Sequence, residues 1–428
     1  MSSSCTFELA DYPIEETKCY PIPELMVFFR ERDRRVFVRK VCERNPLVWG
    51  NLHGDASEEE AFTYSIRIYE FKSRLDLLGF TLEKTKRDFE ESKLGEIERM
   101  TDTNDRLRER LYDSDLAILE RASFEDFLVA FQTIRERRLR GFSTESIVQH
   151  DDVRLVKRLF RNNRENFDFF PCHDIRFLIR AFAETCPEHA FATYDLTDIV
   201  HAGYYEPDDP IAELATQSLI GEYPRHGKII ILTEGKMDRR ILEDSLRLLY
   251  PHLADYFSFM DFEVSKAEGG AGALVSTVRA FIGAGIMNRT IALFDNDTAA
   301  AEALRGLALI AVPENIKIVR LPEIDLARNY PTLGPNGIAR SDINGLACAI
   351  ELYLGQDVLE ADGDLVPVQW TGYSRSEEKY QGVLVNKQCV HSRFVDKLEA
   401  CKREPSRLEE FDWANLRTIF ERVFCAFH

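Results

Sequence analysis

The chain has 428 residues, a formal net charge of −18 and 45% hydrophobic residues, values that are typical of a water-soluble protein with two or three domains. No stretch approaches the roughly 18 uninterrupted apolar residues of a membrane span, and the first residues lack a basic segment followed by an apolar one, so we expect neither membrane insertion nor secretion. The nine cysteines form no C-x-x-C pair, which argues against a zinc ribbon or a disulfide framework and favours a cytoplasmic location. The acidic charge argues against a constitutive, non-specific coat on nucleic acid, although single sites must be judged locally.

The first half of the chain predicts mainly helices. Short strand-like segments lie at residues 6–9 and 35–41, and a helical pattern extends from about 57 to 217. Within it Ser123 precedes an apolar stripe at helical spacing, and Asp209-Pro210 opens another helix. Residues 81–113 are highly charged and predict a solvated helical hairpin.

Beyond a turn-rich boundary at residues 221–227, strands and helices alternate, which indicates crossover units and a parallel sheet. We expect strands at 228–233, 257–264, 290–294 and 315–321, and helices at 237–250, 273–282 and 299–309. Further on the pattern predicts a helix at 342–354, a strand at 366–370 and a closing helix at 410–427.

Acidic residues follow two of these strands directly. Glu234 ends the first strand in K-I-I-I-L-T-E-G, with Asp238 four residues later, and Asp295 and Asp297 end the third in I-A-L-F-D-N-D-T. The carboxyl ends of parallel strands share one edge of a sheet, so these groups are expected to meet in one cleft. Hard divalent cations bind carboxylate oxygens, so the pattern predicts a site for Mg²⁺ or Mn²⁺ and phosphoryl-transfer chemistry. Each acid alone would also fit an ordinary helix start.

Residues 226–355 resemble a TOPRIM domain, the metal-binding fold of topoisomerases, primase and OLD-type nucleases. The resemblance implies Glu234 as the acid/base or metal-bridging residue, and Asp295 and Asp297 as ligands of one or two ions. In the OLD-like branch a further acid follows an Ile and precedes an aromatic residue, and Ile350-Glu351-Leu352-Tyr353 looks like that element. Glu351 is therefore a fourth candidate ligand, or an exposed helical residue. Glu323 and Asp325 are weaker candidates.

The upstream region resembles the N-terminal domain that accompanies TOPRIM or HEPN effectors in bacterial conflict systems, on the stretch Y-P-I-P-E-L-M-V-F-F-R-E-R-D-R-R-V-F from Tyr20. The expected fold class is a Rossmann-like α/β TOPRIM domain after a mainly helical α+β domain. We expect domains at 1–222, 223–355 and 356–428. The Arg and His of a HEPN ribonuclease, five positions apart, are found together only at Arg247 and His252, so no second active site is expected.

Two further segments have a functional and a structural interpretation. Basic residues recur at helical spacing, with Phe160 among them and Phe167 just after them: Arg154, Lys157, Arg158, Arg161 and Arg164. They would follow a phosphate backbone or form a solvated face. The turn at residues 269–272, G-G-A-G, would present backbone N–H groups to a phosphate or serve as a plain strand-to-helix turn.

The leading hypothesis is a Mg²⁺- or Mn²⁺-dependent nuclease that acts on DNA or RNA as an effector of defence against phage or mobile DNA. A protein partner or self-association would replace the ATPase motor that the chain lacks. The alternatives are a HAD-type phosphatase, because Asp295-Asn-Asp297-Thr298 resembles D-x-D-x-T with its Thr one position early, and a non-catalytic sensor or assembly subunit.

Overall fold

The computed structural model describes residues 3–52, 54–107, 110–139, 153–159, 167–222, 227–265, 268–308, 310–361 and 363–428. The chain divides into two compact units, Met1–His226 and Gly227–His428. The second unit contains residues 356–428, whose separation as a domain of their own stays a prediction. In the described part of the chain, no helix has the length and apolar character needed to cross a bilayer.

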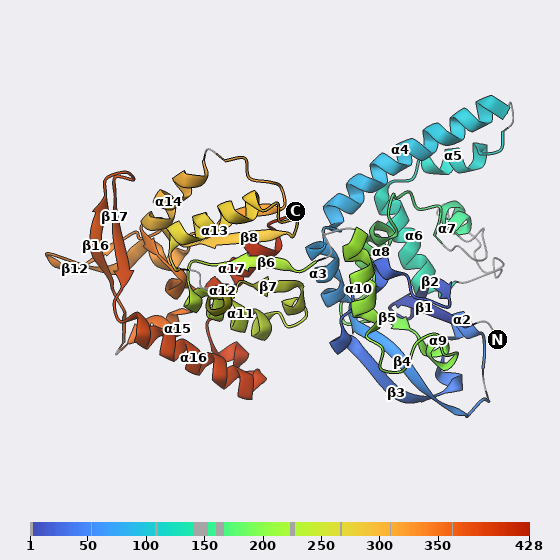
Figure 1. Ribbon diagram of the computed structural model, residues 1–428. Coiled ribbons are helices and arrows are strands. Elements are labelled where there is room, and N and C mark those ends of the chain that lie inside the picture. Colours follow the sequence, from blue (N-terminus) through green and yellow to red (C-terminus); the bar gives the residue numbers. More distant parts are fainter. Residues whose placement is uncertain are drawn as a thin grey trace. The chain divides into compact units, whose positions relative to one another are not determined.

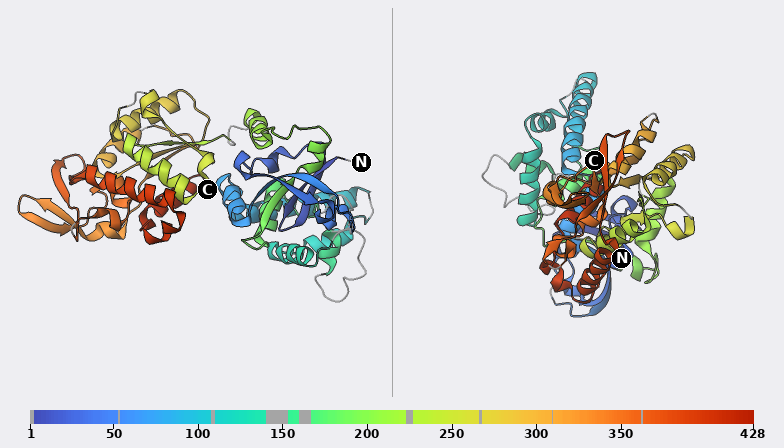
Figure 2. Two further views of the ribbon diagram at one scale, coloured as in Figure 1. Left: turned by 90° about the horizontal axis from the view of Figure 1, so that it is seen from below. Right: turned by 90° about the vertical axis from the view of Figure 1, so that its left-hand side faces the viewer.

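The first unit is built on a five-stranded antiparallel sheet in the order β2-β1-β5-β4-β3. Its strands are β1 Ser4–Leu9, β2 Tyr12–Lys18, β3 Arg34–Lys40, β4 Glu58–Arg67 and β5 Phe191–Asp195. Its α-helices are α1 Pro23–Met26, α2 Pro46–Trp49, α3 Ile68–Leu77, α4 Leu82–Leu107, α5 Asp113–Leu119, α6 Phe124–Glu136, α7 Val153–Leu159, α8 Ile175–Glu184, α9 Thr197–His201 and α10 Ile211–Glu222. The long helix α4 projects from this unit with α5 beside it (Figures 1 and 2).

Strand β4 corrects the expectation of helices from residue 57 onward. Its residues alternate, with Phe62, Tyr64 and Ile66 buried on one face and smaller side chains between them, a period of two that only a strand satisfies. The predicted cap is confirmed, because the Ser123 hydroxyl accepts the Asp126 N–H at 3.1 Å at the start of α6.

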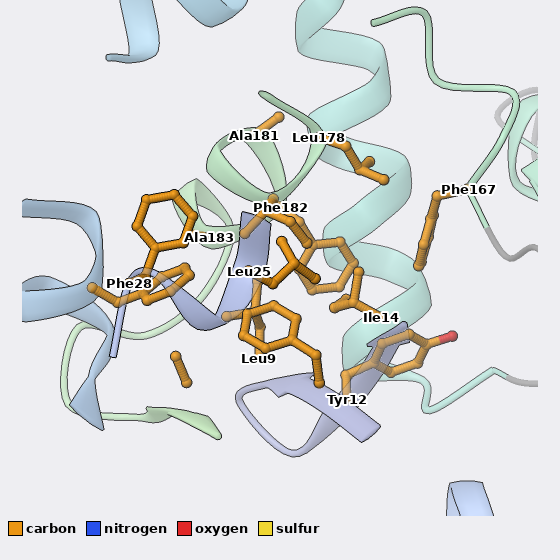
Figure 3. Close-up of a cluster of buried hydrophobic side chains, with 14 of the residues drawn as sticks. Leu9, Tyr12, Ile14, Leu25, Phe28, Phe167, Leu178, Ala181, Phe182 and Ala183 are labelled. Carbon is orange, nitrogen blue, oxygen red and sulfur yellow. The ribbon is translucent and has the colours of Figure 1, made fainter. Parts of the chain in front are cut away.

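An aromatic core lies between the sheet and its helices. Phe182 of α8 packs against Tyr12 and Phe167 in the cluster drawn in Figure 3, with ring centroids 5.7 and 5.5 Å apart. Phe89 of α4 is fully buried, so α4 is anchored in this core along one side instead of being solvated all round. These aromatic contacts pack the helices against the sheet.

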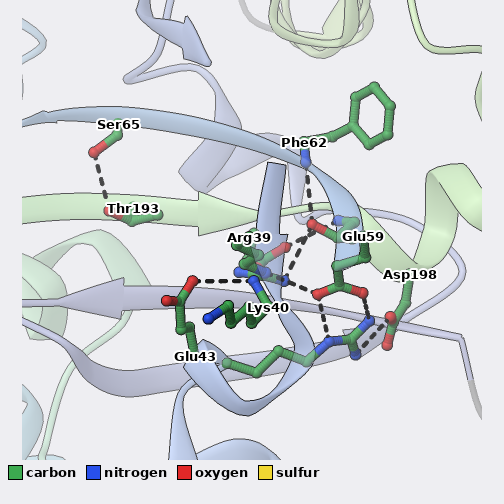
Figure 4. A network of polar contacts seen from close by, with 11 residues as sticks. Arg39, Lys40, Glu43, Glu59, Phe62, Ser65, Thr193 and Asp198 are labelled. Atoms are coloured by element: carbon green, nitrogen blue, oxygen red, sulfur yellow. Dashed lines mark hydrogen bonds and ion pairs between the residues drawn. The ribbon is translucent and has the colours of Figure 1, made fainter. Parts of the chain in front are cut away.

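The other face of the sheet carries a polar network, shown in Figure 4. Arg39 pairs with Glu59 and with Asp195, at 2.8 Å in each case, and Arg44 pairs with Glu59 and Asp198. These charges are largely shielded from water, and each guanidinium meets two carboxylates. The network therefore ties β3, β4 and β5 to the start of α9.

The second unit contains a parallel sheet in the order β10-β8-β6-β7, which confirms the predicted α/β alternation. Its strands are β6 Ile229–Leu232, β7 Phe257–Phe259, β8 Thr290–Phe294 and β10 Ile316–Arg320. The helices between them are α11 Lys236–Leu249, α12 Phe262–Ser265, α13 Ala271–Gly283 and α14 Thr298–Leu304. Helix α13 lies along one face of the sheet and α11 along the other (Figure 1).

A second sheet, in the order β12-β11-β16-β17, follows in the chain. The remaining elements are β9 Asn296–Asp297, β11 Tyr330–Gly334, β12 Gly337–Ser341, β13 Ala347–Cys348, α15 Gln356–Leu359, β14 Glu360–Ala361, β15 Asp364–Leu365, β16 Val368–Ser374, β17 Lys379–Leu384, α16 Lys387–Arg403 and α17 Ala414–Phe424. The predicted helix at 342–354 is wrong. Gly345 turns the chain at φ 71°, β13 pairs with β9, and a short 3₁₀ helix, Ile350–Tyr353, follows.

Candidate functional site

Glu234 lies just beyond the carboxyl end of β6, where Gly235 starts α11. The glycine-rich turn before α13 holds its backbone, because the Gly270 N–H donates to the Glu234 carbonyl oxygen at 2.7 Å. A Cβ at Gly269 would stand 3.4 Å from the same oxygen, tighter than most such contacts. This turn therefore positions Glu234, and its Gly270 N–H is not open to a phosphate.

Asp295 and Asp297 follow β8, the strand next to β6 in the sheet. The Asp295 N–H donates to the Glu234 carboxylate at 2.9 Å, so the two strand ends are directly connected. Asp297 caps α14 by accepting the Ala300 N–H at 2.7 Å. The structure thus brings Glu234 and Asp295 together at the edge that the sequence predicts.

Five carboxylates form what we call the acid cluster: Glu234, Asp238, Asp295, Asp297 and Glu351. Burial raises the pKa of Asp295 well above its usual range, and the other four carboxylates raise it further. The Ile350 N–H donates to Asp295 at 3.2 Å, and this contact brings the 3₁₀ helix that carries Glu351 to the site. Glu323 and Asp325 are instead exposed to solvent.

Glu351 is buried, with 4% of its surface exposed, and is paired with two basic side chains from α16. Lys387 Nζ lies 3.1 Å from one carboxylate oxygen and His391 Nε2 lies 3.1 Å from the other. Burial alone would raise the pKa of Glu351, but His391 and Lys387 outweigh it and the net shift is downward. Burial would lower the pKa of Lys387, yet Glu351, Asp295 and Asp238 raise it. Lys387 is therefore the counter-charge of the acid cluster.

Two members of the cluster have pKa values near neutrality. Burial, with repulsion from Asp297 and Asp238, raises the pKa of Glu234 to about 7. Burial and the Glu351 carboxylate raise the pKa of Asp238 to about 6. Such groups exchange protons close to physiological pH, as catalytic acids and bases do.

The chemistry of this donor set fits a hard divalent cation, because five mutually repelling carboxylates at one sheet edge leave an excess of negative charge. In the described residues, however, no group of three or more His, Cys, Asp or Glu side chains is placed to hold an ion. Backbone N–H groups bind oxygens of Glu234, Asp295 and Asp297, and Lys387 and His391 bind Glu351. Each of these backbone bonds engages one oxygen of its carboxylate, whereas both oxygens of Glu351 are engaged, so Glu351 in particular would have to exchange a present donor for a cation.

Sequence reasoning did not include Asp238, Lys387 or His391 in the site. Asp238 stands one helical turn after Glu234, a spacing that could have shown it. Lys387 and His391 are likewise four residues apart and share one face of α16. Nothing local, however, indicates that this face meets Glu351.

Comparison with known proteins identifies the family to which the first unit is similar. Residues 1–225, more than half of the chain, match the family described as HEPN/Toprim N-terminal domain 1. The chain belongs to this family. No curated protein and no solved structure matches the chain. Membership in the HEPN/Toprim N-terminal domain family suggests a nuclease-like function and a nucleic-acid substrate.

Part of the predicted basic stripe lies within this HEPN/Toprim N-terminal domain. Arg154 and Lys157 of α7 are exposed, as a phosphate-binding role requires. Arg158 is turned inward, where it binds both oxygens of Asp115 at 2.8 and 2.9 Å and covers the Phe169 ring. Arg161 and Arg164 lie outside the described residues. Arg158 thus has a structural partner, and binding of nucleic acid by this segment stays a prediction.

A cavity of about 380 Å³ in the same domain is lined by Ser92, Cys172 and His173, among others. Ser92 Oγ lies 2.7 Å and Asp88 lies 2.9 Å from His173 Nδ1. Both partners meet the same ring nitrogen, so the imidazole cannot pass a proton from one to the other. Burial raises the pKa of Cys172 to about 12, which leaves its thiol unreactive. These groups do not form a second nucleophilic site.

Proposed function

We propose that the second unit is a TOPRIM-type, OLD-like nuclease that hydrolyses phosphodiester bonds with Mg²⁺ or Mn²⁺. The observation that carries this proposal is the acid cluster, in which carboxylates from the ends of β6 and β8, from α11 and from the 3₁₀ helix at Glu351 surround Asp295. Clusters of this kind serve phosphoryl transfer, where a cation polarises the phosphate and activates water.

The chain's own residues would divide the work. Asp295, Asp297, Asp238 and Glu351 supply oxygens for the cation, and Glu234, with its pKa of about 7, accepts and returns a proton at the attacking water. The Arg320 guanidinium donates to the Asp297 carbonyl oxygen at 3.2 Å, which fixes the backbone behind this carboxylate. We further propose that the nuclease is an effector of bacterial defence, as the resemblance of the upstream region implies.

The phosphatase alternative has no support in the geometry. The Asp295 motif follows the third strand of the second unit in chain order, not the first. Its Thr298 hydroxyl donates to the Tyr380 carbonyl oxygen at 2.8 Å instead of facing an open phosphate site.

Cleavage assays with a matched pair of Asp→Asn variants test the proposal. We expect the wild type to cleave plasmid, single-stranded DNA or RNA with Mn²⁺ but not with EDTA. Asp295→Asn should lose cleavage and Mn²⁺ binding by calorimetry, and its metal-free melting temperature should stay equal or rise because like-charge repulsion is relieved. Asp325→Asn is the control, since the Asp325 side chain is 93% exposed and pairs with Arg328. A wild type that binds no Mn²⁺ would refute the metal site.

A further inference from the structure

The hairpin of β16 and β17 carries three aromatic side chains on one face. Tyr373 and Tyr380 are paired across the strands with ring centroids 5.1 Å apart, and Trp370 lies 6.0 Å from Tyr380. Residues three apart on a regular strand would point to opposite faces, but a bulge between Trp370 and Gly372 restores the alignment. The hairpin lies at the margin of the unit (Figure 1). We call these three residues the aromatic row.

The two tyrosines of the aromatic row are open to solvent, while Trp370 is half-buried. Tyr373 is 52% and Tyr380 is 59% exposed, large fractions for paired aromatic residues. Gly382 makes room for Trp370, since a Cβ at this position would stand only 3.1 Å from the Trp370 ring. The rings meet at steep angles, 68° between Tyr373 and Tyr380 and 54° between Trp370 and Tyr380, so part of each tyrosine ring stays exposed and can contact a planar base.

The aromatic row begins beside the acid cluster. Thr298, the residue after Asp297, donates its hydroxyl to the Tyr380 carbonyl oxygen at 2.8 Å. At the other end of β17, the chain leads within three residues to Lys387, which pairs with Glu351. The segment after Asp297 is therefore bonded to the backbone of β17, so a strand bound at the acid cluster would reach the hairpin that carries the rings.

The charge of the chain also favours stacking as the source of affinity. A protein with net charge −18 cannot hold a polyanion by a general electrostatic coat. Aromatic rings attract the π-face of every base independently of charge. Near the aromatic row, Glu377 pairs with Arg305 at 2.6 Å, and exposed Lys379 and Arg375 lie beside exposed Glu378, so charges of both signs accompany the rings.

We propose that Trp370, Tyr373 and Tyr380 stack the bases of single-stranded nucleic acid beside the acid cluster. The substrate is then a single strand, or a duplex with unpaired nucleotides, because paired bases do not expose their faces. This proposal takes its functional meaning from the proposed nuclease, but the binding itself is independent of cleavage.

Binding measured without metal tests the aromatic row. Fluorescence anisotropy with labelled single-stranded DNA, single-stranded RNA and a matched duplex, all in EDTA, should show a preference for single strands. The Tyr373→Ala/Tyr380→Ala double variant should bind single strands about tenfold more weakly or worse. Tyr373→Phe/Tyr380→Phe should bind like the wild type, because the rings remain. Tyr20→Ala is the control, since Tyr20 is 60% exposed and lies in the first unit.

The outcomes separate this proposal from that of the nuclease. Three outcomes would overturn the proposal for the aromatic row: equal binding of duplex and single strand, unchanged binding by the double Ala variant, or no binding by the wild type. The exposed rings would then be a surface for a protein partner. If binding depends on the rings but neither the wild type nor any variant cleaves nucleic acid, only the proposed nuclease activity is refuted. If the ring substitutions leave the rate of cleavage unchanged, only the proposed role of the aromatic row is refuted. Melting curves confirm that the compared variants are folded.

Discussion

Glu8 on β1 has a carboxyl group that the fold keeps away from water. Burial raises its pKa from 4.5 to about 7. The charges of Asp195 and Asp11 raise the pKa further, while a hydrogen bond from the Asn45 amide lowers it. A raised pKa means that the folded state binds the proton more tightly than the unfolded chain does. This tighter proton binding stabilises the folded state fully below pH 4.5, and the stabilisation is lost as the pH rises to about 7. The free energy of unfolding changes by ~3 kcal/mol at most.

Glu8→Gln mimics the protonated side chain, so the variant should be more stable than the wild type at pH 8 and nearly equal to it at pH 4.5. Urea unfolding at both pH values measures the difference. Glu16→Gln, an exposed position on β2, should change neither value. A Glu8→Gln gain that is the same at both pH values would show that Glu8 does not titrate in this range.

The ammonium group of Lys387 neutralises part of the negative charge of the acid cluster. Lys387→Met removes this positive charge, so we expect a lower melting temperature without metal and a larger rise on adding Mn²⁺ than in the wild type, because the cation then takes over the missing charge. Differential scanning fluorimetry with and without Mn²⁺ measures both. Lys402→Met, on the same helix, is the matched control because Lys402 pairs with Glu399 and Asp244. An equal Mn²⁺ shift in both variants argues against the role of Lys387.

At the scale of elements, the parallel sheet could be predicted because its central strands, β6 and β8, are almost entirely buried and read as continuous apolar runs. The same runs end on Glu234 and Asp295, so these site residues were predicted with them. Strand β4 was missed because its outer face is acidic or small, and residues 342–354 were missed because an Asn-Gly turn interrupts their helical stripe. Lys387 and His391 could not be predicted, since only tertiary packing brings α16 to Glu351.

At the scale of the whole molecule, the division into two compact units predicts that each has its own core. A fragment of residues 227–428 should therefore fold alone, with a cooperative thermal transition, and should bind Mn²⁺ as the full chain does. Circular dichroism and calorimetry of the fragment test this. A fragment ending at residue 386 is the comparison, since it lacks α16 and α17 with their buried Val390, Phe394 and Leu416 and should not melt cooperatively. Failure of the longer fragment to fold would mean that the second unit depends on the first.

The position of α16 in the chain also has a consequence for biosynthesis. The ribosome releases β6, β8 and the Glu351 segment before it releases Lys387 and His391. Until then the nascent second unit exposes carboxylates that have no ammonium or imidazole partner from this helix, and their mutual repulsion opposes compaction. The acid cluster therefore closes late, when translation has passed α16. A premature stop before this point leaves a chain whose acids are present but uncompensated, and such a product would be a ready target for cellular proteases.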